Sequence, residues 1–183
     1  VIKPLVMAAA LDTGVLTPET TYVDKGVVVV NKKEIRNFDL KARGLASMQT
    51  VLDQSLNTGM VFVENKLGHD NMRKYMKSYG IGTKTGIDLP NETSGLIKNL
   101  DSPRDIEYAN AAFGQGIALT PIGAVRAFSS IINGGNMVTP HLVKQIRFDG
   151  GSSKIIEYPV TKEGLIKKET SDTINRMLVH VFE

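Results

Sequence analysis

The run of apolar residues between Leu5 and Ala10 is the segment that most constrains the fold of this chain. A helix built from Leu, Val, Met and three consecutive Ala residues is apolar on nearly every side, so it has to be buried. Pro4 suits the first turn of such a helix, where its missing N–H costs nothing, and Gly14 is a typical residue to end it. The pattern therefore predicts a buried helix over residues 1–13.

Apolar residues at helical spacing predict five further helices. Their positions are Leu45, Met48 and Leu52; Met60, Val63 and Leu67; Met72, Tyr75, Met76 and Tyr79; Ile122, Val125, Ser129 and Ile132; and Ile174, Met177, Leu178 and Val181. Gly68, Gly80 and Gly134 are predicted to end the second, third and fourth of these helices. Asp70 is predicted to cap the third, and the Thr120-Pro121 pair predicts an N-cap followed by proline in the first turn of the fourth.

The strands that the sequence predicts are few and short. Tyr22-Val23 and residues 26–30 are strand candidates within a turn-rich section. Residues 142–148 and 154–158 predict a hairpin, because the turn residues at 149–152 are Asp-Gly-Gly-Ser. The order of several helices, a hairpin and a last helix predicts an α+β fold.

Length and composition indicate an ordinary globular protein and exclude several classes of site. The 183 residues suit one domain or a large piece of one. The formal charge of +3 is spread along the chain without a polybasic segment, so nucleic-acid binding has little support. The chain contains no cysteine, which excludes disulfides and thiolate metal sites. It opens on Val1 without an initiator Met, so we expect an excised segment whose parent carries any membrane anchor upstream.

Ser55 and Asn57 are the first pair of residues with possible chemistry. If the loop between two predicted helices is extended, residues two apart point to the same side, and both polar groups face one cleft. Leu56 would then anchor the loop in the core. The alternative is that Ser55 ends one helix and Asn57 caps the next, and this commoner arrangement is favoured when the three residues are taken alone.

Lys3 lies in the first turn of the predicted apolar helix. Burial and the positive end of the helix dipole both disfavour the charged form of a lysine there. Such a lysine can act as the base for a nucleophile one turn earlier, which would be upstream of Val1. The alternative is that the Lys3 side chain reaches solvent, with its methylene groups along the apolar surface.

Three other features invite a functional interpretation. Lys84-Thr85-Gly86 spells a motif of penicillin-recognising enzymes, but it lies in the irregular section 80–105, which has many Gly, Pro, Asn and Ser residues, rather than on a core strand. The three histidines are isolated in the sequence and are predicted to be surface or packing residues, without metal-ligand spacing. The glycines at 114 and 116 allow close backbone approach, so Gly114-Gln115-Gly116 is predicted to have a mainly structural role close to the site.

The order and spacing of five segments resemble the transpeptidase domain of class B penicillin-binding proteins. The segments are 2–11; Ser55-Leu56-Asn57; Gly80-Ile81-Gly82 with 85–92 and Gly95; 113–117 with Thr120-Pro121; and Asn133-Gly134-Gly135 with Pro140. The resemblance implies an α+β transpeptidase fold like that of penicillin-binding proteins and serine β-lactamases, with a helical cluster and an antiparallel sheet. Residues 1–183 would be an incomplete part of that domain.

The resemblance also implies roles for single residues. Lys3 would be the lysine of a Ser-x-x-Lys motif, and Ser55 and Asn57 would be the first and third residues of a Ser-x-Asn motif. The nucleophilic serine would lie just upstream of the chain and the Lys-Thr-Gly strand downstream. Segment 84–86 would belong instead to the family's Thr-Gly-Ile-Asp-Leu-Pro loop. We therefore expect the chain by itself to be inactive.

In the intact parent, the implied reaction is peptidoglycan cross-linking. The serine would attack the penultimate D-Ala carbonyl of a stem peptide, release the terminal D-Ala and pass the acyl group to an amine of a neighbouring stem. Lys3 would deprotonate the serine, Ser55 would carry the proton toward the leaving amine, and Asn57 would hold the substrate amide and orient Lys3. Segment 114–116 would contribute to substrate binding. β-Lactams would acylate the same serine, and no cofactor or metal is implied.

The implied partners are peptidoglycan stem peptides, β-lactam antibiotics and membrane proteins of the division or elongation machinery. The implied location is the extracytoplasmic face of the bacterial cytoplasmic membrane. The absence of Trp and the run Ser102-Pro103-Arg104, which leads into Phe113-Gly114-Gln115-Gly116, resemble the division branch of the family more than the elongation branch. Two alternatives stay open at this stage. One is a β-lactam sensor or non-catalytic interaction domain, and the other is a serine β-lactamase, against which segments 80–95 and 114–116 count.

Overall fold

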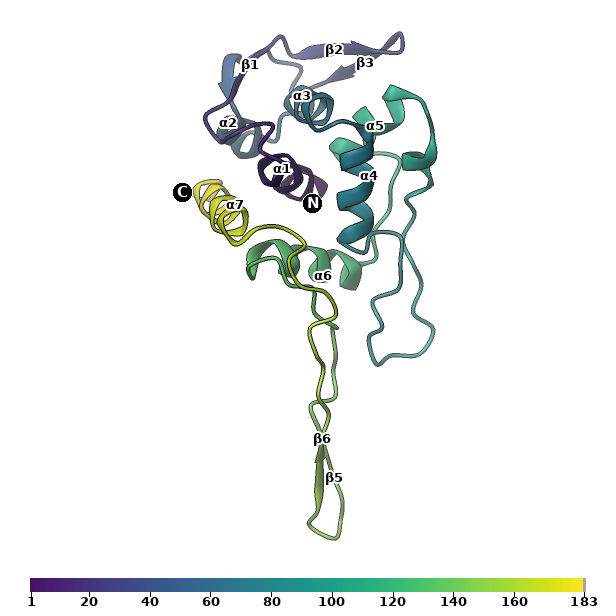
Figure 1. The fold of residues 1–183 in the computed structure, drawn as a ribbon. Helices are drawn as coiled ribbons and strands as arrows, with labels where there is room; N and C mark the ends of the chain where they lie inside the picture. Colours follow the sequence, from purple (N-terminus) through teal and green to yellow (C-terminus); the bar gives the residue numbers. More distant parts are fainter. Residues whose placement is uncertain (183) are drawn as a thin grey trace.

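Helix α1 (Ile2–Asp12) lies at the centre of the computed structural model, which describes residues 1–182 (Figure 1). The residues from Leu5 to Ala10 are fully buried, because α3, α4, α5, α6 and α7 all pack against α1. The apolar sequence of this helix therefore has a direct physical reason: no side of it faces water. The predicted buried helix is confirmed.

Six other α-helices and one short 3-10 helix surround α1 in the described residues. They are α2 (Met48–Asp53), α3 (Asn57–Leu67), α4 (His69–Ser78), η1 (Lys98–Asp101), α5 (Asp105–Ala112), α6 (Pro121–Ile132) and α7 (Lys168–His180). Thr120 caps α6 as predicted, with its side-chain oxygen accepting a hydrogen bond from the Gly123 N–H at 3.1 Å. Asp70 does not cap α4 as predicted. It lies inside the first turn, where it accepts a hydrogen bond from Arg73 instead.

The buried face of α6 is not the predicted one. Val125 and Ile132 are 60% and 46% exposed, whereas Arg126 and Ser130 are buried. Hydrophobicity alone misplaces this face because both buried polar groups find acceptors: the Ser130 hydroxyl donates to the Ala127 carbonyl at 2.7 Å, and the Arg126 guanidinium donates to a neighbouring loop.

The strands of residues 1–182 form three separate two-stranded antiparallel ladders. β1 (Thr21–Asp24) pairs with β4 (Gly44–Ser47), β2 (Val27–Val30) with β3 (Lys33–Arg36), and β5 (Gln145–Arg147) with β6 (Ser153–Ile155). β1, β2 and the β5–β6 hairpin were predicted, although β5 and β6 are shorter than expected. The prediction that Leu45 is part of a helix is wrong, because Leu45 lies on β4 and its side chain is 73% exposed. The helix begins later, at Met48, where the side chain of Ser47 caps α2.

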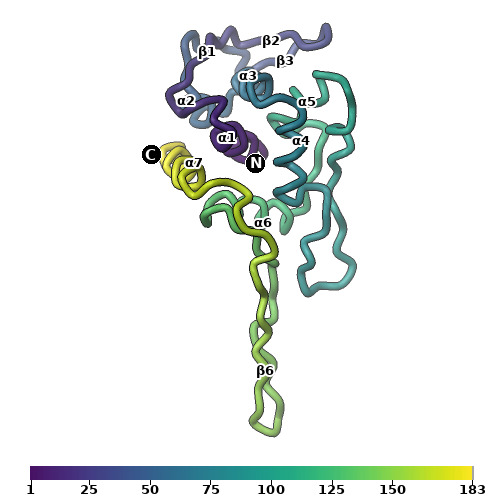
Figure 2. The backbone as a smooth tube through the Cα atoms, viewed as in Figure 1, coloured from purple at the N-terminus to yellow at the C-terminus, as the bar shows by residue number. Residues whose placement is uncertain are grey.

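The β5–β6 hairpin extends away from the helices as a narrow arm (Figure 2). Asp88 fixes the base of this arm by accepting hydrogen bonds from the N–H groups of Leu142 at 2.8 Å and Val143 at 2.9 Å. These two N–H groups hold the pKa of the Asp88 carboxyl below its ordinary value. Through Asp88, the irregular section 80–105 is thus joined to the segment that leads into the arm.

A cluster of helices together with small, separate antiparallel ladders gives the α+β class that the sequence predicted. Within residues 1–182, every helix is too short or too polar to cross a bilayer.

Candidate active site

Lys3, Ser55 and Asn57 meet at one point, although 52 residues separate the first two. The Lys3 Nζ atom lies 2.9 Å from Ser55 Oγ, 2.8 Å from Asn57 Oδ1 and 2.5 Å from the Ser55 carbonyl oxygen. An ammonium group has three N–H donors, and here each has its own acceptor. The three predicted residues therefore form one hydrogen-bonded cluster.

Lys3 is held rigidly at the start of α1. Its neighbour Ile2 is only 4% exposed, and the next apolar turn is fully buried. Burial lowers the pKa of the Lys3 ammonium from its ordinary 10.5 to about 8. This lysine therefore does not extend freely into solvent, and its neutral form is accessible near physiological pH.

Ser55 lies in a tight connection between α2 and α3. Its φ of 52° places it in the left-handed region, so the connection is not the extended loop that the sequence analysis assumed. A serine in this conformation is strained, and such strain persists only where surrounding contacts fix it. Leu56 supplies one of them, being 1% exposed, which confirms its predicted role as the anchor of the loop.

Asn57 is the first residue of α3 rather than its cap. The cap position is Leu56, which makes no side-chain capping bond. The Asn57 amide instead bridges two elements: its Nδ2 donates to the Arg36 carbonyl at 2.9 Å while its Oδ1 accepts from Lys3. Since a carbonyl oxygen can only accept, Arg36 determines which end of the Asn57 amide faces Lys3.

The segment Gly114-Gln115-Gly116 lies beside the start of α1. A Cβ added at Gly114 would lie 3.5 Å from Ile2 Cγ1, and both glycines have positive φ, 97° and 76°. A Cβ at Gly116 would lie 2.3 Å from Asn99 Nδ2, so a side chain there would displace the Asn99 amide in addition to straining the backbone. Gln115 is exposed. The turn thus packs next to the residue that precedes Lys3, and its part in substrate binding stays a prediction.

Segment 84–86 is a loop and not a strand. Glu92 folds back over it, accepting hydrogen bonds from the Thr85 N–H and hydroxyl, both at 2.6 Å, and from the Gly86 N–H at 2.9 Å. This arrangement agrees with the prediction that these residues are not the strand motif they spell.

The three histidines are packing or surface residues, as predicted. His69 stacks on Tyr108 and His141 stacks on Tyr158, each with ring centroids 3.8 Å apart, and His180 lies 3.2 Å from the Asp53 carboxylate. Across residues 1–182, no group of three or more His, Cys, Asp or Glu side chains is arranged to hold a metal ion.

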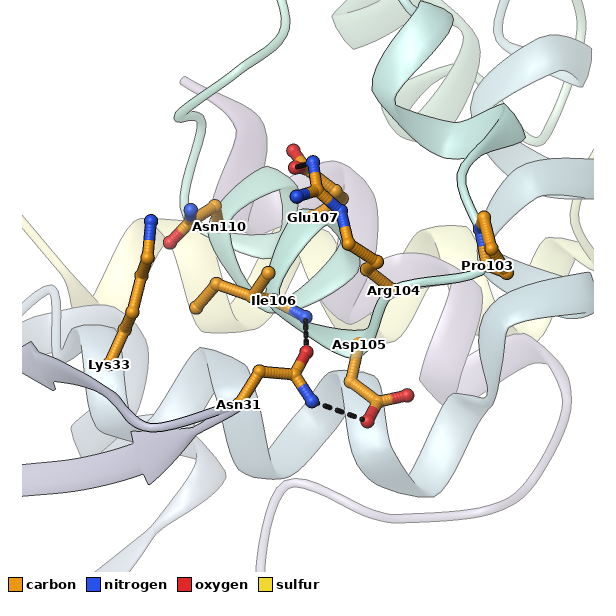
Figure 3. Close-up of a pocket in the computed structure, with 8 residues that line it drawn as sticks. All are labelled: Asn31, Lys33, Pro103, Arg104, Asp105, Ile106, Glu107 and Asn110. Carbon is orange, nitrogen blue, oxygen red and sulfur yellow. Dashed lines mark hydrogen bonds and ion pairs between the residues drawn. The ribbon is translucent and has the colours of Figure 1, made fainter.

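A separate cavity of about 530 Å³ opens between the β2–β3 turn and the start of α5 (Figure 3). Asn31 forms one wall and caps α5, accepting from the Ile106 N–H at 2.9 Å and donating to Asp105 at 3.3 Å. Arg104 pairs with Glu107 on the opposite wall. These polar groups bond to one another, and none of the predicted site residues lines this cavity.

Comparison with known proteins matches the whole chain to one family. The family model described as penicillin binding protein transpeptidase domain matches residues 1–183. Stage V sporulation protein D of Bacillus subtilis is 35% identical over 98% of the chain, and a peptidoglycan D,D-transpeptidase FtsI homolog of Chlorokybus atmophyticus is 30% identical over 77% of it. The chain spans 28% and 23% of the length of these two relatives, less than a third of each.

Solved structures give the same result for the fold. Penicillin binding protein 2X of Streptococcus thermophilus aligns with 97% of the chain at a TM-score of 0.87 and 26% identity, over 26% of its own length. Penicillin binding protein 3 of Mycobacterium tuberculosis, complexed with aztreonam, aligns with 99% of the chain at a TM-score of 0.90 and 22% identity, over 40% of its own length. The second similarity shows the fold alone.

Proposed function

The chain belongs to the penicillin-binding protein transpeptidase family, and we propose that the protein which carries it cross-links peptidoglycan as a serine D,D-transpeptidase. The observation that carries this proposal is the Lys3–Ser55–Asn57 cluster with its lowered lysine pKa. Serine acyl transfer needs a base, a proton relay and a group that holds the substrate. The neutral lysine, the hydroxyl and the carboxamide can fill these three roles in that order.

The nucleophile is proposed to be a serine three residues before Lys3, one turn earlier on the same helical face. Neutral Lys3 has two N–H groups and one lone pair. The lone pair accepts the serine proton, and the serine oxygen attacks the carbonyl carbon of the penultimate D-Ala of a stem peptide. Electron density moves to the carbonyl oxygen, where backbone N–H groups stabilise it.

The tetrahedral intermediate then expels the terminal D-Ala. The proton held by Lys3 reaches the leaving amine through the Ser55 hydroxyl, which lies 2.9 Å from Nζ. An amine of a second stem peptide then attacks the acyl-enzyme carbonyl and gives up a proton through Ser55 to the neutral Lys3, and Lys3 passes this proton to the serine oxygen as the acyl–serine bond breaks. Asn57 donates to or accepts from the substrate amide while its Oδ1 keeps Lys3 in place.

β-Lactams would acylate the same serine, which agrees with the names of the relatives. This protein would act outside the cytoplasmic membrane, where its substrate lies, alongside membrane proteins of the division or elongation machinery. A Lys-Thr-Gly strand downstream of residue 183 would complete the site, with residues 1–183 as one part of the domain.

The test is labelling with a fluorescent penicillin, on this chain and on a protein extended at both ends. We expect a stable adduct that survives denaturation on the extended protein alone. Absence of the adduct on the extended protein would refute the assignment and favour a non-catalytic binding domain. Rapid loss of the label would point to a β-lactamase, since a transpeptidase stays acylated.

We also expect acylation of the extended protein to accelerate with pH, with a midpoint near pH 8. The neutral form of Lys3 is the base, and its pKa is lowered to about 8, so its neutral fraction at pH 7 is about one tenth. For an ordinary lysine this fraction would be about 300-fold smaller. The measurement is the second-order rate constant for penicillin acylation between pH 6 and 10. A midpoint near pH 10 would contradict the role assigned to burial.

A further inference from the structure

We propose that Asp24 is a positioning residue for the Lys3–Ser55–Asn57 cluster, acting through a buried hydrogen-bond network that fixes segment 36–43 and the start of α3. This inference rests on the proposed transpeptidase function. The hydrogen bonds of Asp24 within residues 1–182 go to Gly26, Asn37, Arg43 and Thr58 and not to the three cluster residues, so its effect on them is transmitted through these partners.

The Asp24 carboxylate is 1% exposed and uses both oxygens fully. Oδ1 accepts from the Thr58 hydroxyl at 2.7 Å and the Gly26 N–H at 2.9 Å. Oδ2 accepts from Asn37 Nδ2 at 2.9 Å and the Arg43 N–H at 3.0 Å. A buried carboxylate with four donors joins three chain segments that are otherwise separate in the sequence.

The first path from this network to the cluster runs through Asn37. Its Nδ2 is held by Asp24, so its Oδ1 is directed at the Thr58 N–H, 3.2 Å away. Thr58 directly follows Asn57, and the carbonyl directly before Asn37 is the Arg36 oxygen that accepts from Asn57 Nδ2. The orientation of the Asn57 amide toward Lys3 is therefore fixed by residues that Asp24 holds.

The second path runs through Arg43. Its backbone N–H bonds to Asp24, and its side-chain Nε donates to Gln54 Oε1 at 2.5 Å. Gln54 directly precedes Ser55, whose φ of 52° needs support from its surroundings. The two paths thus hold the connection on both sides of Ser55.

The prediction concerns the change of Asp24 to Asn in the extended protein. An amide replaces one acceptor oxygen by an NH₂ group, so two donors face each other and the network loosens. Because small displacements of catalytic groups cost up to about a hundredfold, we expect penicillin acylation about 10- to 100-fold slower. We also expect the acylation midpoint above pH 8, since a looser loop hydrates Lys3 and weakens the effect of burial.

Three further variants separate positioning from stability. Thr58→Val keeps the side-chain shape and removes the hydroxyl donor, so it should slow acylation in the same direction, and Thr58→Ser should restore the rate. Asp12→Asn is the matched control. Asp12 is also a poorly exposed carboxylate, accepting from Tyr75, Thr170 and the Lys167 N–H, but it lies at the far end of α1, about 14 Å from Lys3. It should lower the melting temperature without changing the rate or the pH midpoint.

The outcomes are distinguishable. Unchanged acylation rate and pH midpoint in folded Asp24→Asn, or in Thr58→Val if Asp24→Asn does not fold, would overturn the inference. If the wild-type extended protein forms no adduct with the fluorescent penicillin, the proposed function is refuted instead. In that case the titration of Lys3 in this chain, followed by NMR with ¹³C-labelled lysine, still decides the inference. An equal Lys3 pKa with and without the Thr58 hydroxyl overturns it, and an upward shift supports it.

Discussion

Replacing Lys3 by Met, in a protein extended upstream to include the proposed serine, is expected to lower the rate constant of penicillin acylation by about 10²- to 10⁴-fold. Met has a similar length and fills the same space but cannot accept a proton. The hydrogen bonds from Nζ to Ser55 and Asn57 are lost with it. The measurement is single-turnover acylation at pH 8, with the melting temperature recorded in parallel.

The matched control for this variant is Lys154→Met. Lys154 lies on β6 at the exposed end of the arm, so the same chemical change there should leave acylation unaltered. If Lys3→Met retains more than about a tenth of the wild-type rate, Lys3 is not the base, because a general base contributes more than this. The cluster would then have to be read as a structural contact.

Replacing Arg126 by Ala is expected to reduce the free energy of unfolding by about 3 kcal/mol, since hydrogen bonds from a charged group contribute about 1.5–3 kcal/mol and truncating a buried side chain also leaves a cavity. Arg126 is 7% exposed. Its guanidinium donates to the carbonyls of Gly80, Lys84 and Thr85 at 3.1–3.2 Å and to the Thr83 hydroxyl at 3.2 Å. Arg126 therefore ties the whole 80–85 turn to α6.

Two measurements test this prediction. Urea denaturation gives the free energy of unfolding, and limited trypsin digestion should cut after Lys84 faster once the turn is released. Arg147→Ala is the control, because Arg147 lies on the exposed strand β5 and should lose less than about 0.5 kcal/mol. A similarly small loss for Arg126→Ala would mean that water replaces the guanidinium in the turn.

The candidate site was only partly predictable from the sequence. Ser55 and Asn57 were paired by their spacing, and their meeting with Lys3 came from the family resemblance, since nothing local relates residues 52 positions apart. The assumed backbone was wrong: the connection is left-handed at Ser55 rather than extended. The contact that orients Asn57 is a main-chain carbonyl of Arg36, and carbonyls carry no sequence signal at all.

Local patterns determined most of the helices. The apolar run of α1 and the Thr120-Pro121 cap of α6 act over one or two turns, so a short stretch of sequence is enough to specify them. Helix α5 was missed for the opposite reason. The Ile106 N–H in its first turn is capped by Asn31, 75 residues earlier, and the local signal is limited to the acidic residues Asp105 and Glu107 in that turn.

The sequence by itself determined the family, the α+β class and the buried central helix. Helical periodicity depends on residues within a few turns, and the order of the motifs can be followed directly along the chain. Only the tertiary structure decided which face of α6 is buried, how β3 and β4 pair, and how Asp24 holds the connection around Ser55. These features depend on polar groups finding partners far away in the chain. Burying such groups is favourable only once the fold brings the partners together.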